Sequence, residues 1–421
     1  MMMARAPSVV WVLAATLLAG VSGYLVMWLV ARALGAADYS VFGVFWSGLF
    51  LIVGVLFGVQ QEMTRATADA LHRPIRSAPR SSLFVFAGVL AVGVAVVVAL
   101  SSVWWVPATM GSEHAELSIQ VALGSAANAL VATVSGLLAG ARLWRHLALV
   151  IAVDAVIRLV LVGLVLGVNG DIAMLAWAVI LPFPLTVGIV FMVFPRTVGR
   201  LSSSALTYRE LTANAGQTML AASATALIIN GFPLVLAFFA EQGEAAQLGA
   251  LILAITITRA PVLVPLMALQ SYLVTRFTGL ETSPWKLIRE FLGVIVLVMV
   301  VLAVVTLLWG TAAFEVLIGK EFALSSVVLV PLVVSSGFIG ALCVTGPALL
   351  ARRHHRLYSL GWVIASIVSI GMLFLPVGLA EKAALALSVG PLVGLLVHLV
   401  SLRTFGSSST RRTDIGTAPA L

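Results

Sequence analysis

Apolar residues run along almost the whole chain in stretches of about 20 residues, and polar residues gather in short segments between these stretches. A helix of about 20 apolar residues crosses the hydrocarbon layer of a bilayer, because each residue adds about 1.5 Å. Strands of an outer-membrane barrel would instead alternate apolar and polar positions over about ten residues. The pattern therefore predicts twelve transmembrane helices, near residues 8–31, 39–62, 82–105, 117–140, 146–168, 172–194, 212–239, 246–273, 286–309, 323–350, 357–379 and 382–402.

The first of these stretches has a second interpretation. It follows Arg5 and ends at Ala31-Arg32-Ala33, which resembles a signal-peptide cleavage site. At about 24 residues it is longer than the apolar region of a typical secretory signal. We interpret it as the first transmembrane span, with a cleaved signal as the alternative.

Composition agrees with a polytopic, all-α membrane protein. Of the 421 residues, 61% are hydrophobic and 10% are charged, whereas soluble domains carry roughly 25% charged residues. The single cysteine, Cys343, excludes a disulfide framework and a thiolate zinc site. The sequence contains no phosphate-binding loop, dinucleotide fingerprint or hydrolase motif. We therefore expect no enzymatic activity, no cofactor and no metal.

The basic residues indicate the topology. With the N-terminus in the cytoplasm, nineteen of the 24 Lys and Arg residues fall in inner segments, three in outer loops and two within spans. This is the asymmetry that the positive-inside rule describes. We expect a bacterial inner-membrane protein with both termini cytoplasmic, and we attribute the net charge of +8 to topology rather than to nucleic-acid binding.

The connection between the sixth and seventh spans carries Ser202, Ser203 and Ser204 and divides the spans into two sets of six. Both sets start on the same side, so a pseudo-twofold axis along the membrane normal should relate them. We expect an N-lobe at 1–200, a C-lobe at 201–405, and a disordered cytoplasmic tail at 406–421, rich in Ser, Thr and Gly.

Ionisable residues inside a bilayer usually face a bundle interior or an aqueous cavity, because charge is costly in hydrocarbon. Arg259 lies in the middle of a span, with no acid nearby in sequence and with Pro261 and Pro265 following it. A lone guanidinium suits phosphate, since it offers a fork of donors and keeps its charge. Substrate contact and interhelical bonding are the two interpretations of this residue.

Two local pairs also carry charge into spans. Asp154 and Arg158 are four residues apart and lie on one helical face. They form either a structural ion pair or a substrate site, with Arg158 on an anion and Asp154 as its partner. Glu62 and Arg65 are three residues apart at the inner end of a span, where an interfacial pair and a cavity-facing role are both open.

Amide side chains form a third group of candidates. They could donate to sugar hydroxyls or bind neighbouring helices. The cavity candidates are Gln60, Gln61, Gln217, Asn230 and Gln270.

Two short segments resemble a known family. The sequence from Ala31 to Gly43, with Leu34-Gly35 and Tyr39 to Phe42, resembles the Leu-Gly-x-x-x-Tyr-Gly-x-Phe segment of polysaccharide flippases in the multidrug/oligosaccharidyl-lipid/polysaccharide exporter superfamily. Ser40 stands where that family commonly has glycine. Leu317 to Ala323 resembles the Phe-Gly-x-x-Tyr segment of the same family, with Phe322 in place of tyrosine, and Gly136 to Arg142 is also similar to the pattern around its fourth helix.

The resemblance implies a V-shaped pair of six-helix lobes around a central cavity. It implies a flippase that moves a polyprenyl-pyrophosphate-linked oligosaccharide from the cytoplasmic to the outer leaflet by alternating access, for cell-surface polysaccharide biosynthesis. Arg259 would engage the pyrophosphate, with Arg158 and Arg65 as weaker candidates. Partners would be membrane lipids and a glycan polymerase or glycosyltransferase. The first span carries no cation, which departs from some lipid-precursor flippases.

Other functions remain open. An ion-coupled multidrug antiporter of the same superfamily is the main alternative, and it would place an unpaired acid at depth in the membrane. A membrane-embedded glycosyl or acyl transferase would need larger outer loops than this chain has. A structural membrane partner is the remaining class.

Overall fold

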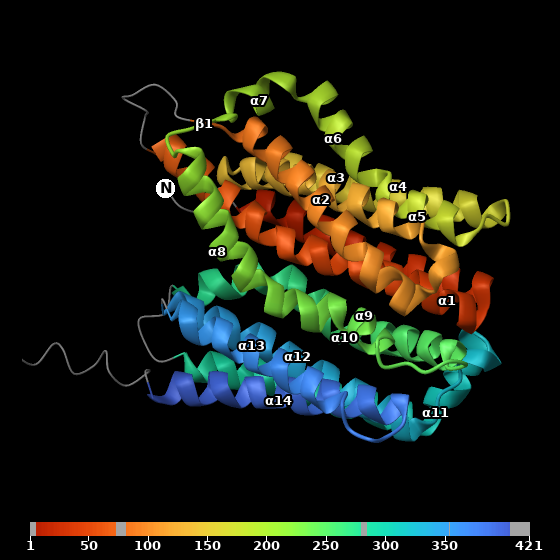
Figure 1. Ribbon diagram of the computed structural model, residues 1–421. Coiled ribbons are helices and arrows are strands. Elements are labelled where there is room, and N and C mark those ends of the chain that lie inside the picture. The colour runs from red at the N-terminus through yellow and green to blue at the C-terminus, as the bar shows by residue number, and fades with distance from the viewer. Residues whose placement is uncertain (1–5, 73–80, 279–283, 353, 405–421) are drawn as a thin grey trace, which may run out of the picture. The chain divides into compact units, whose positions relative to one another are not determined.

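The computed structural model describes residues 6–72, 81–278, 284–352 and 354–404, and it is almost entirely helical (Figure 1). Among these residues, ten helices are long and apolar enough to cross a membrane. The first of them, Val10–Leu71, is long enough for two spans. Every one of the twelve apolar stretches falls on helix, so the predicted all-α, polytopic class is confirmed.

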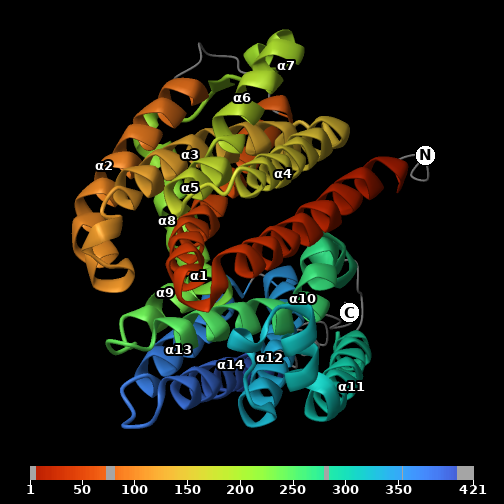
Figure 2. The ribbon, with the colours of Figure 1, turned by 90° about the vertical axis from the view of Figure 1, so that its right-hand side faces the viewer.

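The chain begins with α1 (Ala6–His72), which bends at Gly35 (Figure 2). Gly35 has φ 78° and ψ 169°, a left-handed conformation that glycine adopts without strain. The first two predicted spans are therefore the two arms of α1, joined at this glycine. The following helices are α2 (Leu83–Met110), η1 (Ser112–His114), α3 (Leu117–Gly140) and α4 (Trp144–Gly167).

Prolines and glycines interrupt the sixth and seventh predicted spans. The sixth is α5 (Ile172–Ile180) followed by α6 (Pro182–Val193), since Pro182 starts a new helix. The seventh is α8 (Tyr208–Ala226), a π-helical turn η2 (Leu227–Gly231) and α9 (Phe232–Ala237). Thr207 caps α8 in a reciprocal pair with Glu210, which fixes where that helix begins.

Two connections between predicted spans are paired with each other. The two-residue strands β1 (Ser81–Ser82) and β2 (Ser203–Ser204) run antiparallel, and the short helix α7 (Pro195–Arg200) precedes β2. The hydroxyl of Ser81 donates to the carbonyl of Leu206 at 2.7 Å. These contacts join the start of α2 to the start of α8.

The remaining elements are α10 (Ala245–Thr278), α11 (Trp285–Leu317), η3 (Lys320–Phe322), α12 (Ser326–Ala351), α13 (His355–Met372) and α14 (Leu379–Thr404). Backbone contacts divide the chain into two compact units. One contains residues 1–260 and 309–325, and the other contains residues 261–308 and 326–421. These units are defined by contacts and differ from the two topological halves expected at 1–200 and 201–405, which stay a prediction. The expected disordered tail at 406–421 lies outside the described residues.

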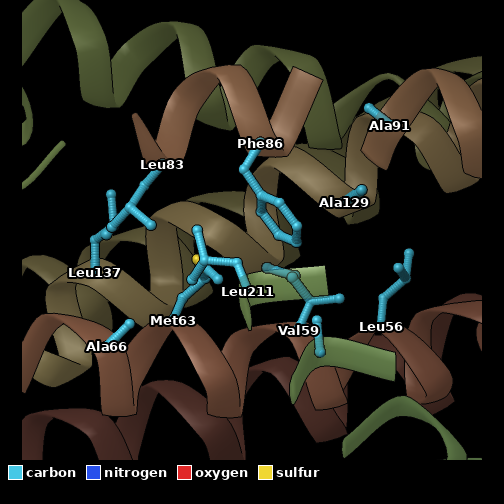
Figure 3. Packing of buried hydrophobic residues seen from close by; sticks show 12 residues of the cluster. Leu56, Val59, Met63, Ala66, Leu83, Phe86, Ala91, Ala129, Leu137 and Leu211 are labelled. Atoms are coloured by element: carbon cyan, nitrogen blue, oxygen red, sulfur yellow. The ribbon is translucent and has the colours of Figure 1, made fainter. Parts of the chain in front are cut away.

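The core of the first unit lies where α1, α2, α3 and α8 meet (Figure 3). Leu56, Val59 and Met63 of α1 pack with Leu83 and Phe86 of α2, and with residues of α3 and α8. Small residues bring the helices close: a Cβ added to Gly136 of α3 would lie 2.6 Å from the carbonyl oxygen of Gln60. Close approach at small residues is the usual way in which transmembrane helices pack.

In the second unit, His398 of α14 is fully buried between α12 and α13. Its Nδ1 lies 3.0 Å from the Thr345 hydroxyl, and its Nε2 lies 3.0 Å from the carbonyl oxygen of Tyr358. Gly361 leaves room for the imidazole ring, because a Cβ there would collide with it. We interpret this histidine as a packed interhelical link.

Candidate functional site

Arg259 is a deeply buried charge in the described part of the first unit. It lies in α10 and is 3% exposed. Its Nη1 donates to the carbonyl oxygens of Ile228 and Ile229, both at 3.1 Å. No carboxylate pairs with it among the described residues, and its Nε and Nη2 have no hydrogen-bond partner there. Arg259 is thus a buried guanidinium with two donor groups that have no partner among the described residues.

One of the two carbonyls that hold Arg259, that of Ile229, lacks its usual helical donor because a proline follows it. Ile228 and Ile229 lie in the π-helical turn η2, and Pro233 follows four residues after Ile229. Proline has no N–H, so it leaves the carbonyl one turn earlier without its usual donor. Arg259 supplies the missing donor from another helix.

Ser47 of α1 bridges the same break. Its hydroxyl donates to the carbonyl of Asn230 at 2.5 Å and accepts from the N–H of Leu234 at 3.1 Å. One side chain therefore satisfies a carbonyl before Pro233 and an amide after it. Ser47 and Pro233 are not among the site residues predicted from the sequence. The Asn230-Gly231-Phe232-Pro233 segment inside an apolar stretch was the available signal.

A second polar region lies between α8 and the end of α1 near Glu62. The predicted topology places this end on the cytoplasmic side. The region is a pocket of about 440 Å³ lined by Glu62, Arg65, Leu206, Glu210, Asn214, Gln217 and Thr218. Three of the predicted site residues, Glu62, Arg65 and Gln217, meet there.

Glu62 is the buried anion of this pocket, at 2% exposure. Arg65 donates to it through Nε at 2.9 Å and Nη2 at 2.7 Å, which is a two-point arrangement. Asn214 of α8 adds a third donor at 3.1 Å. The i,i+3 pairing expected from the sequence is present, while Asn214 comes from a helix 152 residues away.

Asp154 and Arg158 form the i,i+4 pair that their spacing indicates. Nη2 of Arg158 lies 2.7 Å from Oδ2 of Asp154, and Nε donates to the carbonyl of Val179 at 3.3 Å. The guanidinium also lies over the rings of Phe50 and Phe183, at 5.4 and 5.1 Å from their centroids. Arg158 is thus held on several sides, whereas Oδ1 of Asp154 is buried without a partner among the described residues.

The remaining amide candidates lie apart from these groups. The backbone carbonyl of Gln60 accepts from Thr64 at 2.7 Å, and Gln61 is exposed on the next face of α1. Asn230 lies in η2 beside the carbonyls that hold Arg259. The backbone of Gln270 is helical, but its side chain lies outside the described residues.

The two segments that carry the family resemblance meet in the structure. Nη1 of Arg32 donates to the carbonyl of Leu317 at 3.3 Å. The ring of Tyr39 lies edge-on to that of Phe322, with centroids 5.7 Å apart. Sequence reasoning treated these segments separately, because 285 residues separate Arg32 from Leu317.

Fold and site together define a multi-pass, all-helical membrane protein with buried ionisable groups. Among the described residues, no group of three or more His, Cys, Asp or Glu side chains is placed to hold a metal ion. Comparison with protein-family models gives no match.

Solved structures with a similar fold are transporters of the MOP superfamily, the superfamily in which the sequence resemblance lies. "Lipid II flippase MurJ, inward closed conformation" has a TM-score of 0.73 at 13% identity, over 93% of this chain and 87% of that chain. The inward-facing conformation of a multidrug resistance MATE family transporter has a TM-score of 0.68 at 15% identity, over 97% and 98%. A MOP superfamily transporter from Pyrococcus furiosus, described as having a binding pocket of reverse polarity, has a TM-score of 0.65 at 15% identity, over 95% and 96%. At 13–15% sequence identity, this structural similarity shows a shared fold and nothing more.

Closer relatives are mycobacterial. "Uncharacterized protein Rv3630" of Mycobacterium tuberculosis (strain ATCC 25618 / H37Rv) is 35% identical over 387 residues, which cover 90% of this chain and 88% of that protein. "Uncharacterized protein Rv1510" of the same strain is 33% identical over 405 residues, or 94% and 91%. The chain belongs to the family of Rv3630 and Rv1510.

Proposed function

We propose that this protein is a transporter that moves a polyprenyl-pyrophosphate-linked oligosaccharide from the cytoplasmic to the outer leaflet by alternating access, and that Arg259 binds the pyrophosphate. The observation that carries the proposal is the buried guanidinium of Arg259, with no acid partner and two free donors among the described residues. A structural arginine in a membrane usually has its donors satisfied, because an unpaired polar group costs several kcal/mol in hydrocarbon.

The free donors suit a phosphate oxygen pair. Nη1 is engaged by Ile228 and Ile229, so the unpaired edge of the guanidinium carries Nε and Nη2, and both of these nitrogens are buried. These two N–H groups point in parallel and form the fork that binds carboxylate and phosphate at two points. A cationic drug would be repelled by this group, whereas a pyrophosphate would be attracted to it.

Arg158 and Arg65 play lesser parts in this proposal. Each already donates to a carboxylate, Arg158 to Asp154 and Arg65 to Glu62. Their net contribution to an anion site is reduced because the neighbouring acid cancels much of their charge. The polar pocket at Glu62, Arg65 and Gln217 supplies hydrogen-bonding groups of the kind that a sugar needs.

The membrane setting follows from the same proposal. We place the protein in a bacterial inner membrane with both termini cytoplasmic, as the distribution of Lys and Arg favours. The lipid-linked glycan would be delivered on the inner side by glycosyltransferases and used on the outer side by a polymerase. No ATP-binding motif occurs in the chain, so the driving force would be an ion gradient or the membrane potential.

The test is transport in proteoliposomes. Appearance of a polyprenyl-pyrophosphate oligosaccharide in the outer leaflet is measured for the native chain, Arg259→Ala, Arg259→Lys and the control Arg209→Ala, an exposed arginine of α8. We expect Arg259→Ala to lower transport roughly 30-fold, the equivalent of about 2 kcal/mol for a charge contact. Arg259→Lys should retain part of the rate, because it keeps the charge but loses the fork. Equal rates for native protein and Arg259→Ala, at equal thermal stability, would overturn the proposal.

The ion-coupled multidrug antiporter is supported by a different observation. The pocket near α8 contains two acids, Glu62 and Glu210, and one basic residue, Arg65. This balance favours a cation over an anion. Efflux of an amphipathic cation that is lost in Glu62→Gln and kept in Arg259→Ala would support the antiporter in place of the flippase.

A further inference from the structure

A groove between the first arm of α1 and α4 has matched walls and one charged end. Its lining comes from two helical stripes with the same spacing, Trp11, Ala14, Ala15 and Leu18 on α1, and Arg145, Ala148, Leu149 and Ala152 on α4. Residues at i, i+3, i+4 and i+7 lie on one face of a helix, so the two helices turn these faces toward each other.

The two faces do not interlock along their full length. Ser22 donates to the carbonyl of Ala155 at 3.0 Å, so the helices touch at that level. From there toward Trp11 and Arg145 the alanines leave a space of about 420 Å³. Ala15 and Ala148 are buried at its floor, while Trp11, Leu18 and Leu149 remain 40% or more exposed at its rim. The lining on α1 runs from Trp11 to Leu18, seven residues apart, which makes the groove about 10 Å long.

Basic residues lie at only one end of the groove, the end near Trp11. Arg145 is exposed, has no ion pair among the described residues, and lies with its guanidinium 5.9 Å from the centroid of the Trp11 ring. Arg142 and His146 lie beside it in the turn and the first residues of α4. No acidic residue lines the groove. A tryptophan and an arginine at the end of an apolar groove are typical of the level of lipid headgroups.

The volume of the groove limits which molecule can occupy it. A second helix is about 10–12 Å wide, and about 10 Å of it would need about 800 Å³ or more. The available volume of about 420 Å³ is about half of that. A single hydrocarbon chain is thinner than a helix, and a lipid whose chain lies in the groove can leave its headgroup at the end where Arg145 lies.

We propose that this groove is a binding site for an anionic membrane phospholipid, with one acyl chain between α1 and α4 and the phosphate on Arg145. Attraction of an anionic headgroup by Arg or Lys at the cytoplasmic surface amounts to about a fivefold gain in affinity per residue. The bound lipid would fill the gap that the alanines leave and would complete the contact between the two helices. This site does not depend on the transported substrate or on Arg259.

Native mass spectrometry of the full chain tests the proposal. Purified protein is mixed with equal amounts of phosphatidylglycerol and phosphatidylcholine, and the lipids that stay bound are counted. We expect the native chain to retain phosphatidylglycerol and Arg145→Gln to lose this preference about fivefold. Arg209→Gln, an exposed arginine of α8 outside the groove, is the matched control and should behave as the native chain does.

A second variant fills the apolar part of the groove with larger side chains. Ala148→Leu with Ala152→Leu should lower the retention of both lipids, since the added side chains occupy the space of the acyl chain. Gly163→Leu adds similar bulk to α4 where no atom lies within 4 Å, and should leave retention unchanged. If the filled variant does not fold, quenching of Trp11 fluorescence by dibrominated phosphatidylglycerol, compared with Trp11→Phe, supplies the same information.

Three results would overturn the proposal. They are a preference for phosphatidylglycerol that survives Arg145→Gln, retention that survives filling of the groove in a folded variant, and displacement of phosphatidylglycerol from the site by an isoprenoid phosphate. Failure of the transport assay would leave the first two results unaffected, because they are measured without substrate.

Discussion

The hydroxyl of Thr218 on α8 donates to the carbonyl oxygen of Gly58 on α1 at 2.8 Å, across 160 residues of chain. This bond lies at a close crossing of the two helices. A Cβ on Gly58 would lie 2.6 Å from the α-carbon of Met219, and one on Gly54 would lie 2.7 Å from the Cβ of Ala226. The polar pocket at Glu62 lies beyond this crossing, so the crossing sets how α8 presents Asn214 and Gln217 to α1.

Gly58→Ala should therefore destabilise the protein. The added methyl meets backbone atoms of α8, which have little freedom to move, and overpacking of this kind costs about 1–3 kcal/mol. Gly88→Ala is the control, since no atom lies within 4 Å of its added Cβ and alanine favours a helix. Thermal unfolding in detergent should show a lower Tm for Gly58→Ala and an equal or higher Tm for Gly88→Ala. If both variants had the Tm of the native chain, the close crossing would not contribute to stability.

The opened helix at Pro233 gives the second prediction. Alanine at this position restores an N–H one turn after Ile229, and this donor competes with Arg259 for the carbonyl. We expect Pro233→Ala to keep or raise the Tm and to lower transport, because the guanidinium loses one of its two anchors. Pro391→Ala, which changes a proline inside α14 far along the chain from Arg259, serves as the control. Native transport in Pro233→Ala would show that the turn does not position Arg259.

The third prediction concerns Glu62, a buried carboxylate that accepts from Arg65 and Asn214. Glu62→Gln removes the charge and places a donor where an acceptor was needed. Hydrogen bonds to charged groups contribute about 1.5–3 kcal/mol, and we expect the lower end because Arg65 is half-exposed. A double-mutant cycle with Arg65→Gln, followed by thermal unfolding, measures the coupling. A coupling energy near zero would contradict the assignment of this pair as a stabilising contact.

Local features of the sequence predicted the structure well. The apolar stretch at 117–140 corresponds to α3 at both ends, because a change from polar to apolar residues marks where a helix meets water. The pairs Glu62 with Arg65 and Asp154 with Arg158 followed from helix geometry alone, since three or four residues make one turn. Such features need no knowledge of the neighbouring helices.

Features that depend on another helix were not predicted. Arg259 is held by main-chain carbonyls of Ile228 and Ile229, which carry no side-chain signal in the sequence. Ser47 acts on a break that lies 183 residues away. The bend at Gly35 and the contact between Tyr39 and Phe322 likewise depend on which segments meet, and apolar periodicity does not give that information.

The last prediction separates a structural from a functional role for Asp154 and Arg158. Both side chains are largely buried, so removing one leaves an uncompensated charge, which costs about 3–5 kcal/mol. Arg158→Met alone should therefore lower the Tm strongly. Asp154→Leu combined with Arg158→Met removes both charges and should recover most of the stability, since apolar residues of similar volume can replace a buried pair. The transport rate of the stable double variant then distinguishes a structural from a functional role for the pair. We expect a nearly native rate, because Arg158 is already engaged by Asp154, Val179 and two aromatic rings. A stable double variant that no longer transports would instead assign the pair to substrate binding or coupling.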